Sequence, residues 1–190
     1  MTLQTILGVC LALMLSSCAK LPEQHPILGA TTAAASHDKS AFAASGAIAA
    51  KNQHQAWTAT FYWVQNSPHD YQISIYGLMG SAAMDISVKD GVVTYHEGKK
   101  IIRARQAEDL LAKETGIRIP VNHLYYWVKG TPAPGPVEHI ERSADQDIVL
   151  LKQDGFTLNY GDYRHHYPYQ IRLNGHQLMV KIKIREWREK

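Results

Sequence analysis

From about residue 42 to its end, the chain alternates apolar and polar residues in short runs, which is the pattern of β-strands with one buried face. In the final run, Val180, Ile182 and Ile184 alternate with basic residues. Runs of this kind, or runs rich in aromatic and β-branched residues, lie at 57–65, 70–77, 82–89, 92–96, 137–141, 147–153, 155–161, 169–174 and 177–187. The sequence therefore predicts a domain made mainly of β-strands.

Three dipeptides between these runs predict tight hairpin turns. They are Asp90-Gly91, Asp154-Gly155 and Asn174-Gly175. Such pairs favour two-residue turns because both turn positions take a positive φ, which Asn, Asp and Gly tolerate best. Short turns join neighbouring strands, so we expect an antiparallel meander.

Two short helices are expected between the blocks of strands. In 105–116 the apolar residues fall at helical spacing and Gly116 is placed to end the helix. In 120–130, Pro120 suits the first helical position and Gly130 the end. The apolar stripe of the second helix consists of Val121, Leu124, Tyr125 and Val128.

Many antiparallel strands, two helices and then more strands predict a sheet that curls, with the helices packed on it or inside it. A curled sheet of this kind encloses either a cavity lined by apolar side chains, able to hold alkyl chains, or a fully filled core. The pattern alone favours the filled core.

The N-terminus is different. Residues 3–15 are almost wholly apolar, but too few to cross a membrane, and they suit the apolar part of a signal peptide. The stretch "LSSC" that ends at Cys18 resembles the lipobox of bacterial lipoproteins, in which the Cys is acylated and becomes the mature N-terminus. We therefore expect a signal peptide at 1–17, a lipidated N-terminus and flexible tether at 18–41, and a folded domain at 42–190. By resemblance to Gram-negative sorting rules, Ala19 points to the outer membrane.

Composition and motifs argue against several classes of function. The chain has 190 residues, a net charge of +3 and scattered Lys and Arg, which does not suggest a nucleic-acid binder. The ten His residues show no helical metal-ligand spacing, and the adjacent His165 and His166 are unsuited to share one ion from a strand. G-x-S-x-G is absent, and Glu108 and Asp109 fit a solvated helix face. We expect neither an enzyme nor a metal site.

Several segments resemble, in order, the LolB family of outer-membrane lipoprotein receptors. The resemblance covers 42–190 and rests on "GAIAA" at 46, "ATFYW" at 59, "YQISIYGLMGS" at 71, "QAEDLLAKETGIRIPVNHLYYWVKGTP" at 106, "QDGFTLNYGDY" at 153 and a last strand that ends at Trp187. The segment from "GIRIP" to "WVKGTP" is the most specific. Phe156 departs from the family, which usually has Trp there.

The resemblance implies an open, half-closed antiparallel β-barrel of about 11 strands, with helices that cover an apolar cavity. It implies a monomeric receptor that takes triacylated lipoproteins from the periplasmic carrier LolA and inserts them into the inner leaflet of the outer membrane. No cofactor is implied, and no phosphate-binding Gly-rich loop is present. The alternative is a structural or assembly-scaffold lipoprotein without an acyl-binding cavity.

Two sets of residues are expected to act in such a receptor. Leu110, Leu124, Trp127 and Val128 of the two helices are expected to contact cargo acyl chains. In the family, the loop that matches Gly77, Leu78, Met79 and Gly80 protrudes and carries an exposed apolar residue that inserts cargo. The alignment places that role on Met79, beside Leu78. The other interpretation is that these two side chains fold back over the core.

Overall fold

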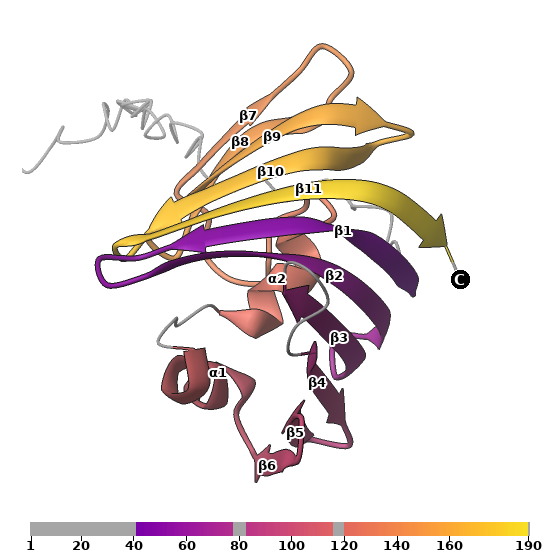
Figure 1. The fold of residues 1–190 in the computed structure, drawn as a ribbon. Coiled ribbons are helices and arrows are strands. Elements are labelled where there is room, and N and C mark those ends of the chain that lie inside the picture. Colours follow the sequence, from indigo (N-terminus) through magenta and orange to yellow (C-terminus); the bar gives the residue numbers. More distant parts are fainter. Residues whose placement is uncertain (1–40, 78–82, 116–119, 190) are drawn as a thin grey trace, which may run out of the picture. The chain divides into compact units, whose positions relative to one another are not determined.

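The computed structural model describes residues 41–77, 83–115 and 120–189, all of which belong to one compact unit at 35–190. Within them the chain forms 11 strands in a single sheet and two helices (Figure 1). This confirms the predicted class, a mainly β fold with two short helices.

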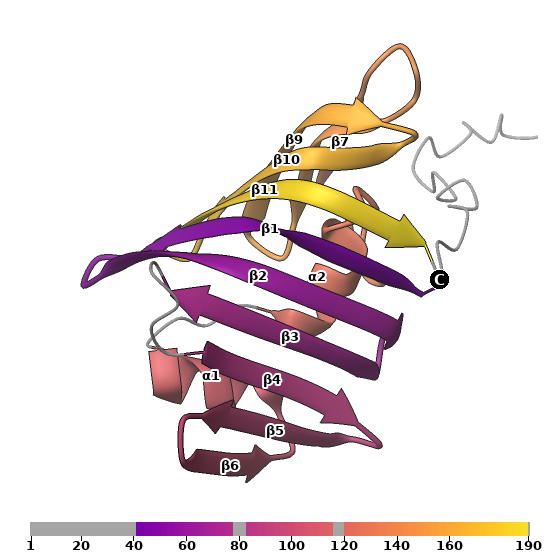
Figure 2. The same cartoon turned by 45° about the vertical axis from the view of Figure 1, so that its right-hand side comes forward.

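The strands follow one another as two meanders. They are β1 (Phe42–Lys51), β2 (Ala56–Ser67), β3 (Asp70–Gly77), β4 (Ala83–Lys89), β5 (Val92–Glu97), β6 (Lys100–Ala104), β7 (His139–Arg142), β8 (Ile148–Gln153), β9 (Phe156–Arg164), β10 (Tyr167–Gly175) and β11 (Leu178–Glu189). The sheet order is β6-β5-β4-β3-β2-β1-β11-β10-β9-β8-β7, and every pair is antiparallel. The sheet is open, with β6 and β7 at its two ends, and the first and last strands pair in its middle (Figure 2).

Both helices, α1 (Ala107–Thr115) and α2 (Val121–Trp127), lie on the concave side of the curled sheet (Figures 1 and 2). Two apolar clusters fill the space between helices and strands. The larger one joins α2 to β1, β2 and β8–β11, and the smaller one joins α1 and Val121 to β3, β4 and β5. Alternation along the strands directs every second side chain into these clusters, which explains the sequence pattern.

The predicted turns are confirmed at Asp90-Gly91 and Asp154-Gly155, where both residues take positive φ. The turn predicted at Asn174-Gly175 is wrong. The turn residues are His176 and Gln177, at φ 48° and 63°. Gly175 instead ends β10, where a Cβ would come within 2.5 Å of the Gly155 carbonyl oxygen, so the glycine permits a close approach of two turns and does not form one.

Two strands, β1 and β6, lie outside the runs that the sequence pattern predicted. β6 is only five residues long and carries two adjacent Ile residues, so it lacks a clear alternation. It pairs with β5 after a turn at Gly98, which has φ 56°. The adjacent His165 and His166 form the turn between β9 and β10, in agreement with their interpretation as surface residues.

Candidate functional site on the concave face

The concave face is organised around α2, which a buried glutamine holds in place. Gln153 at the end of β8 is 1% exposed. Its Oε1 accepts hydrogen bonds from Trp127 Nε1 and from the Ala133 amide, both at 2.9 Å, and its Nε2 donates to the Ala133 carbonyl at 2.8 Å. One side chain thus fixes both the C-terminal end of α2 and the loop that follows it.

Aromatic rings pack beside this clamp. The Phe42 ring lies 5.5 Å from that of Trp63, 5.3 Å from that of Trp187 and 6.3 Å from that of Tyr125. The Nζ of Lys129, a residue only 3% exposed, lies 3.6 Å from the centre of the Tyr125 ring, close enough for a cation–π interaction. The start of β1, the end of β11 and α2 therefore share one rigid aromatic core.

The smaller cluster under α1 contains Leu110, which is 4% exposed and packs with Tyr71, Tyr95 and Val93. An ion pair between Lys100 of β6 and Glu114 also ties α1 to the end of the sheet. The apolar cluster under α1 is smaller than the one under α2, because fewer buried residues form it.

Two buried phenols add polar atoms to this apolar interior. In the part of the chain that the structure describes, the hydroxyls of Tyr71 and Tyr160 have no hydrogen-bond partner, although the residues are only 4% and 7% exposed. Burial is the main cause that raises the pKa of both hydroxyls above the usual 10. The charge of Glu108 raises the pKa of Tyr71 further, and the nearby Tyr163 does the same for Tyr160. Both phenols are therefore neutral at physiological pH and can donate a hydrogen bond.

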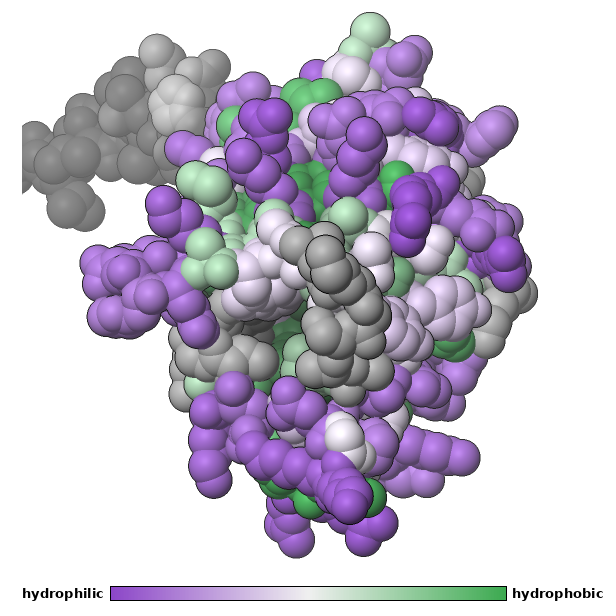
Figure 3. Space-filling model, in the orientation of Figure 1, coloured by the Kyte–Doolittle hydropathy of each residue, from purple (hydrophilic) through white to green (hydrophobic). Residues whose placement is uncertain are grey.

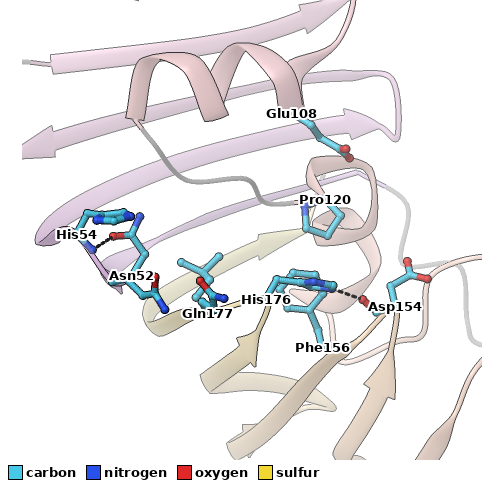
Figure 4. Close-up of a pocket in the computed structure, with 10 residues that line it drawn as sticks. Asn52, His54, Glu108, Pro120, Asp154, Phe156, His176 and Gln177 are labelled. Atoms are coloured by element: carbon cyan, nitrogen blue, oxygen red, sulfur yellow. Dashed lines mark hydrogen bonds between the residues drawn. The ribbon is translucent and has the colours of Figure 1, made fainter.

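A pocket of about 490 Å³ opens at the turn end of the sheet (Figure 4). Its lining comes from separate segments: Asn52, Gln53, His54, Glu108, Pro120, Asp154, Phe156, His176, Gln177 and Leu178. The rim is polar and ordered by local bonds. His176 Nε2 lies 2.9 Å from the Asp154 carbonyl oxygen, the His54 amide donates to Asn52 at 2.9 Å, and His123 Nδ1 lies 2.6 Å from Asp154 Oδ2. Sequence reasoning did not find this pocket, because its residues meet only when the three turns lie together.

The residues predicted to contact acyl chains lie in the two clusters and not in the pocket. Leu110 is in the smaller cluster, Trp127 and Val128 are 1% and 2% exposed in the larger one, and Leu124 is partly buried at its margin. Contact of these side chains with acyl chains stays a prediction. Gly77 ends β3, whereas Leu78, Met79, Gly80 and Cys18 lie outside the described residues.

Figure 3 shows a face on which apolar residues are visible in recesses between polar ones. Among the described residues, no group of three or more His, Cys, Asp and Glu side chains is arranged to hold a metal ion. In the same residues, neither helix has the length and apolar character that a membrane span requires. Among the described residues, the concave face offers apolar and aromatic contacts, the hydroxyls of two neutral phenols and the ammonium group of Lys129.

Comparison with known proteins gives a consistent picture. The family model of the outer membrane lipoprotein LolB matches residues 40–187. The outer-membrane lipoprotein LolB of Stutzerimonas stutzeri is 29% identical over 97% of this chain and 95% of its own, and that of Pseudomonas aeruginosa strain LESB58 is 28% identical over 98% and 97%. The crystal structure of a LolA-superfamily protein from Nitrosomonas europaea shares the fold, with a TM-score of 0.50 and 10% identity over 80% of this chain and 87% of that one. This chain therefore belongs to the LolB family of outer membrane lipoproteins.

Proposed function

We propose that this protein is a lipid-anchored receptor on the periplasmic face of the outer membrane. It accepts acylated lipoproteins from a LolA-type carrier and inserts them into the inner leaflet. Membership of the LolB family supports this proposal, and so does the name of that family, which the relatives share. The step requires no catalysis, since cargo moves from a weaker to a stronger apolar environment.

The observation that carries the proposal is an open sheet whose concave face is apolar and covered by helices. α2 contacts the sheet mainly through apolar and aromatic side chains. Its polar contacts there are that of Trp127 with Gln153 and that of His123 with Asp154, in the turn after β8. An acyl chain can replace such contacts, because each buried methylene contributes about 0.8 kcal/mol wherever the apolar surroundings are. Leu110 and Leu124 are the contacts most suited to exchange, because Leu110 belongs to the smaller cluster and Leu124 is only partly buried, whereas Trp127 is bonded to Gln153 and Val128 is 2% exposed.

Insertion is assigned to the loop from Gly77 to Gly80, with Met79 as the principal residue and Leu78 beside it. Each apolar side chain contributes about 1.5–3 kcal/mol on leaving water, which is enough to touch a bilayer reversibly. Glycines on both sides of the pair allow a sharp turn. Cys18 is the acylated residue that keeps this loop near the leaflet.

The test uses the full-length lipidated receptor in liposomes and a LolA-type carrier loaded with a lipoprotein. After flotation the liposomes are dissolved in mild detergent and the receptor is pulled down: cargo that comes with the receptor has only been accepted, and cargo that stays behind has been delivered. Met79→Glu should accept cargo and fail to deliver it. Ile101→Glu is the matched control, since Ile101 is 61% exposed on β6, and it should deliver like the wild type.

Acceptance without any bound acyl chain would contradict the proposal and favour a scaffold lipoprotein. Normal delivery by both Met79→Glu and Leu78→Glu would remove the insertion role from the loop. The anchor is tested separately by mass spectrometry of the membrane-extracted protein. We expect a chain that begins at acylated Cys18, and an unmodified chain with another first residue would disprove the anchor.

A further inference from the structure

Six exposed cations lie together on the face of the sheet opposite to the helices. They are Lys51, Lys152, Arg172, Lys181, Lys183 and Arg185, and we call them the basic strip. Their strand neighbours Leu151, Leu173, Val180 and Ile184 are buried in the larger apolar cluster with α2. Because side chains alternate along a strand, the basic strip faces away from the concave site.

The strand register brings these charges close to one another. Arg172 of β10 lies directly opposite Lys181 of β11, and Lys183 is the next outward residue on the same strand. Lys51 pairs with Met179, so it extends the strip onto β1. Like charges directly opposite each other destabilise a sheet, so this arrangement is not explained by the stability of the fold.

The acidic residues nearby do not neutralise the strip. Glu186 on β11 pairs with Arg188, and Asp162 on β9 pairs with Arg164. Glu141 at the far end of the same face pairs with His139. No ion pair joins the strip to any acidic residue in the part of the chain that the structure describes. The strip is therefore a region of unneutralised positive charge that attracts an anionic surface.

We propose that the basic strip rests on anionic phospholipid headgroups and holds the domain with its convex face on the leaflet. This inference goes beyond the proposed function and rests on it in one respect, the lipid anchor at Cys18. The phosphate groups of a bilayer form a continuous anionic plane. An outward-facing strip on four of five neighbouring strands, β1, β11, β10 and β8, presents its charges to such a plane together.

The position of the tether favours a bilayer over an acidic protein. Phe42 begins β1 and pairs with Glu189 at the end of β11, so the predicted tether joins the domain on β1, a strand of the strip that pairs with β11. A random coil of about 24 residues has an r.m.s. span of about 27 Å. The anchor thus presents the strip to the membrane at an effective concentration in the millimolar range. A carrier that transfers acyl chains must instead approach the concave side.

The size of the effect follows from the number of charges. Each Lys or Arg near an anionic leaflet strengthens binding about fivefold. The double variant Lys181→Glu/Lys183→Glu should therefore lower the ratio of docked to undocked domain by at least about 25-fold. About 0.5 M NaCl should have a similar effect on the wild type, because salt of that concentration screens charges beyond a few ångströms.

The experiment places the full-length lipidated protein in vesicles of phosphatidylcholine alone, or with about one third phosphatidylglycerol. A water-soluble amine reagent labels exposed lysines, and mass spectrometry reads each site. Without carrier or cargo, Lys51, Lys152, Lys181 and Lys183 should label at least about fivefold more slowly in the anionic vesicles. Lys89 and Lys99, exposed in the β4–β5 and β5–β6 hairpins away from the strip, should label equally in both.

The charge-reversed variant should lose the protection of Lys51 and Lys152, whereas Lys89→Glu/Lys99→Glu, with the same change in charge, should keep it. Equal labelling in both vesicle types would overturn the proposal, as would protection that appears only when the carrier is added. Flotation with phosphatidylcholine vesicles reports the anchor alone. A protein without an anchor that floats only with anionic vesicles would still support the strip, and one that floats with neither would overturn it.

Discussion

Replacement of Gln153 by Leu tests whether one buried amide secures α2. The side chain is 1% exposed and satisfies three buried groups, namely Trp127 Nε1, the Ala133 amide and the Ala133 carbonyl. Leu has a similar size, so the variant leaves these groups without partners and creates little cavity. Each buried unpaired group costs about 1–3 kcal/mol.

The expected loss is large for one substitution. Three groups at about 2 kcal/mol each, less about 2 kcal/mol for the apolar surface that Leu buries, leave a destabilisation of about 4 kcal/mol. For a domain of this size, urea unfolding has a slope of about 2 kcal/mol per molar. The midpoint should therefore fall by about 2 M when the full-length protein is unfolded in detergent and followed by circular dichroism.

Gln72→Leu is the matched control, because Gln72 is exposed on β3 and the chemical change is the same. It should change the free energy of unfolding by no more than about 0.5 kcal/mol. If Gln153→Leu lowers the midpoint no more than Gln72→Leu does, then the three hydrogen bonds are replaced by other contacts and the clamp does not secure α2.

Three further predictions concern the sheet, the buried phenols and the acyl-chain site. Gly46→Ala should lower the free energy of unfolding by more than about 2 kcal/mol, because the new Cβ would lie 2.2 Å from the Lys183 carbonyl oxygen. Urea unfolding should show no such loss for Gly161→Ala, whose Cβ would have nothing within 4 Å. Burial raises the pKa of Tyr167 to about 12 and that of Tyr160 above 10, so the unfolded chain loses these protons first, and the free energy of unfolding should fall by about 1.4 kcal/mol per pH unit per tyrosine above about pH 10. Equal urea midpoints at about pH 9 and 11 would contradict this. Leu124→Glu should lower acceptance of cargo at least tenfold in the pull-down, whereas Asn122→Glu, at an exposed position of the same helix, should not. Normal acceptance by a stably folded Leu124→Glu would exclude contact between acyl chains and this side chain.

Much of the fold is readable from local patterns. Alternation predicted most strands, because one face of an antiparallel sheet is buried and the other is solvated. Asp-Gly pairs predicted two turns, because few other residues accept positive φ at both positions. The turn predicted at Asn174-Gly175 was wrong, since close packing against Gly155 can require glycine as strongly as a turn does.

What the sequence did not show depends on contacts between distant segments. Gln153 and Gln65 are each 1% exposed, yet nothing in their neighbours along the chain marks them as buried amides. The pocket residues His54 and His176 meet only through the pairing of β1 with β11. The candidate helices were located correctly, but local spacing does not reveal which of their side chains pack tightly and which stay at the margin.

The pairing of β1 with β11 also has a consequence for the order of folding. Strands β1 to β6 form one meander and β7 to β11 another, and each can assemble from neighbours in sequence. The two are joined in the sheet by residues 42–51 and 179–189, at opposite ends of the domain. Pairing over such a separation is slow, because the long loop must close before any contact rewards it. The sheet is therefore completed only after the last strand has been synthesised, and a chain truncated before Leu178 would retain two meanders with no strand to join them.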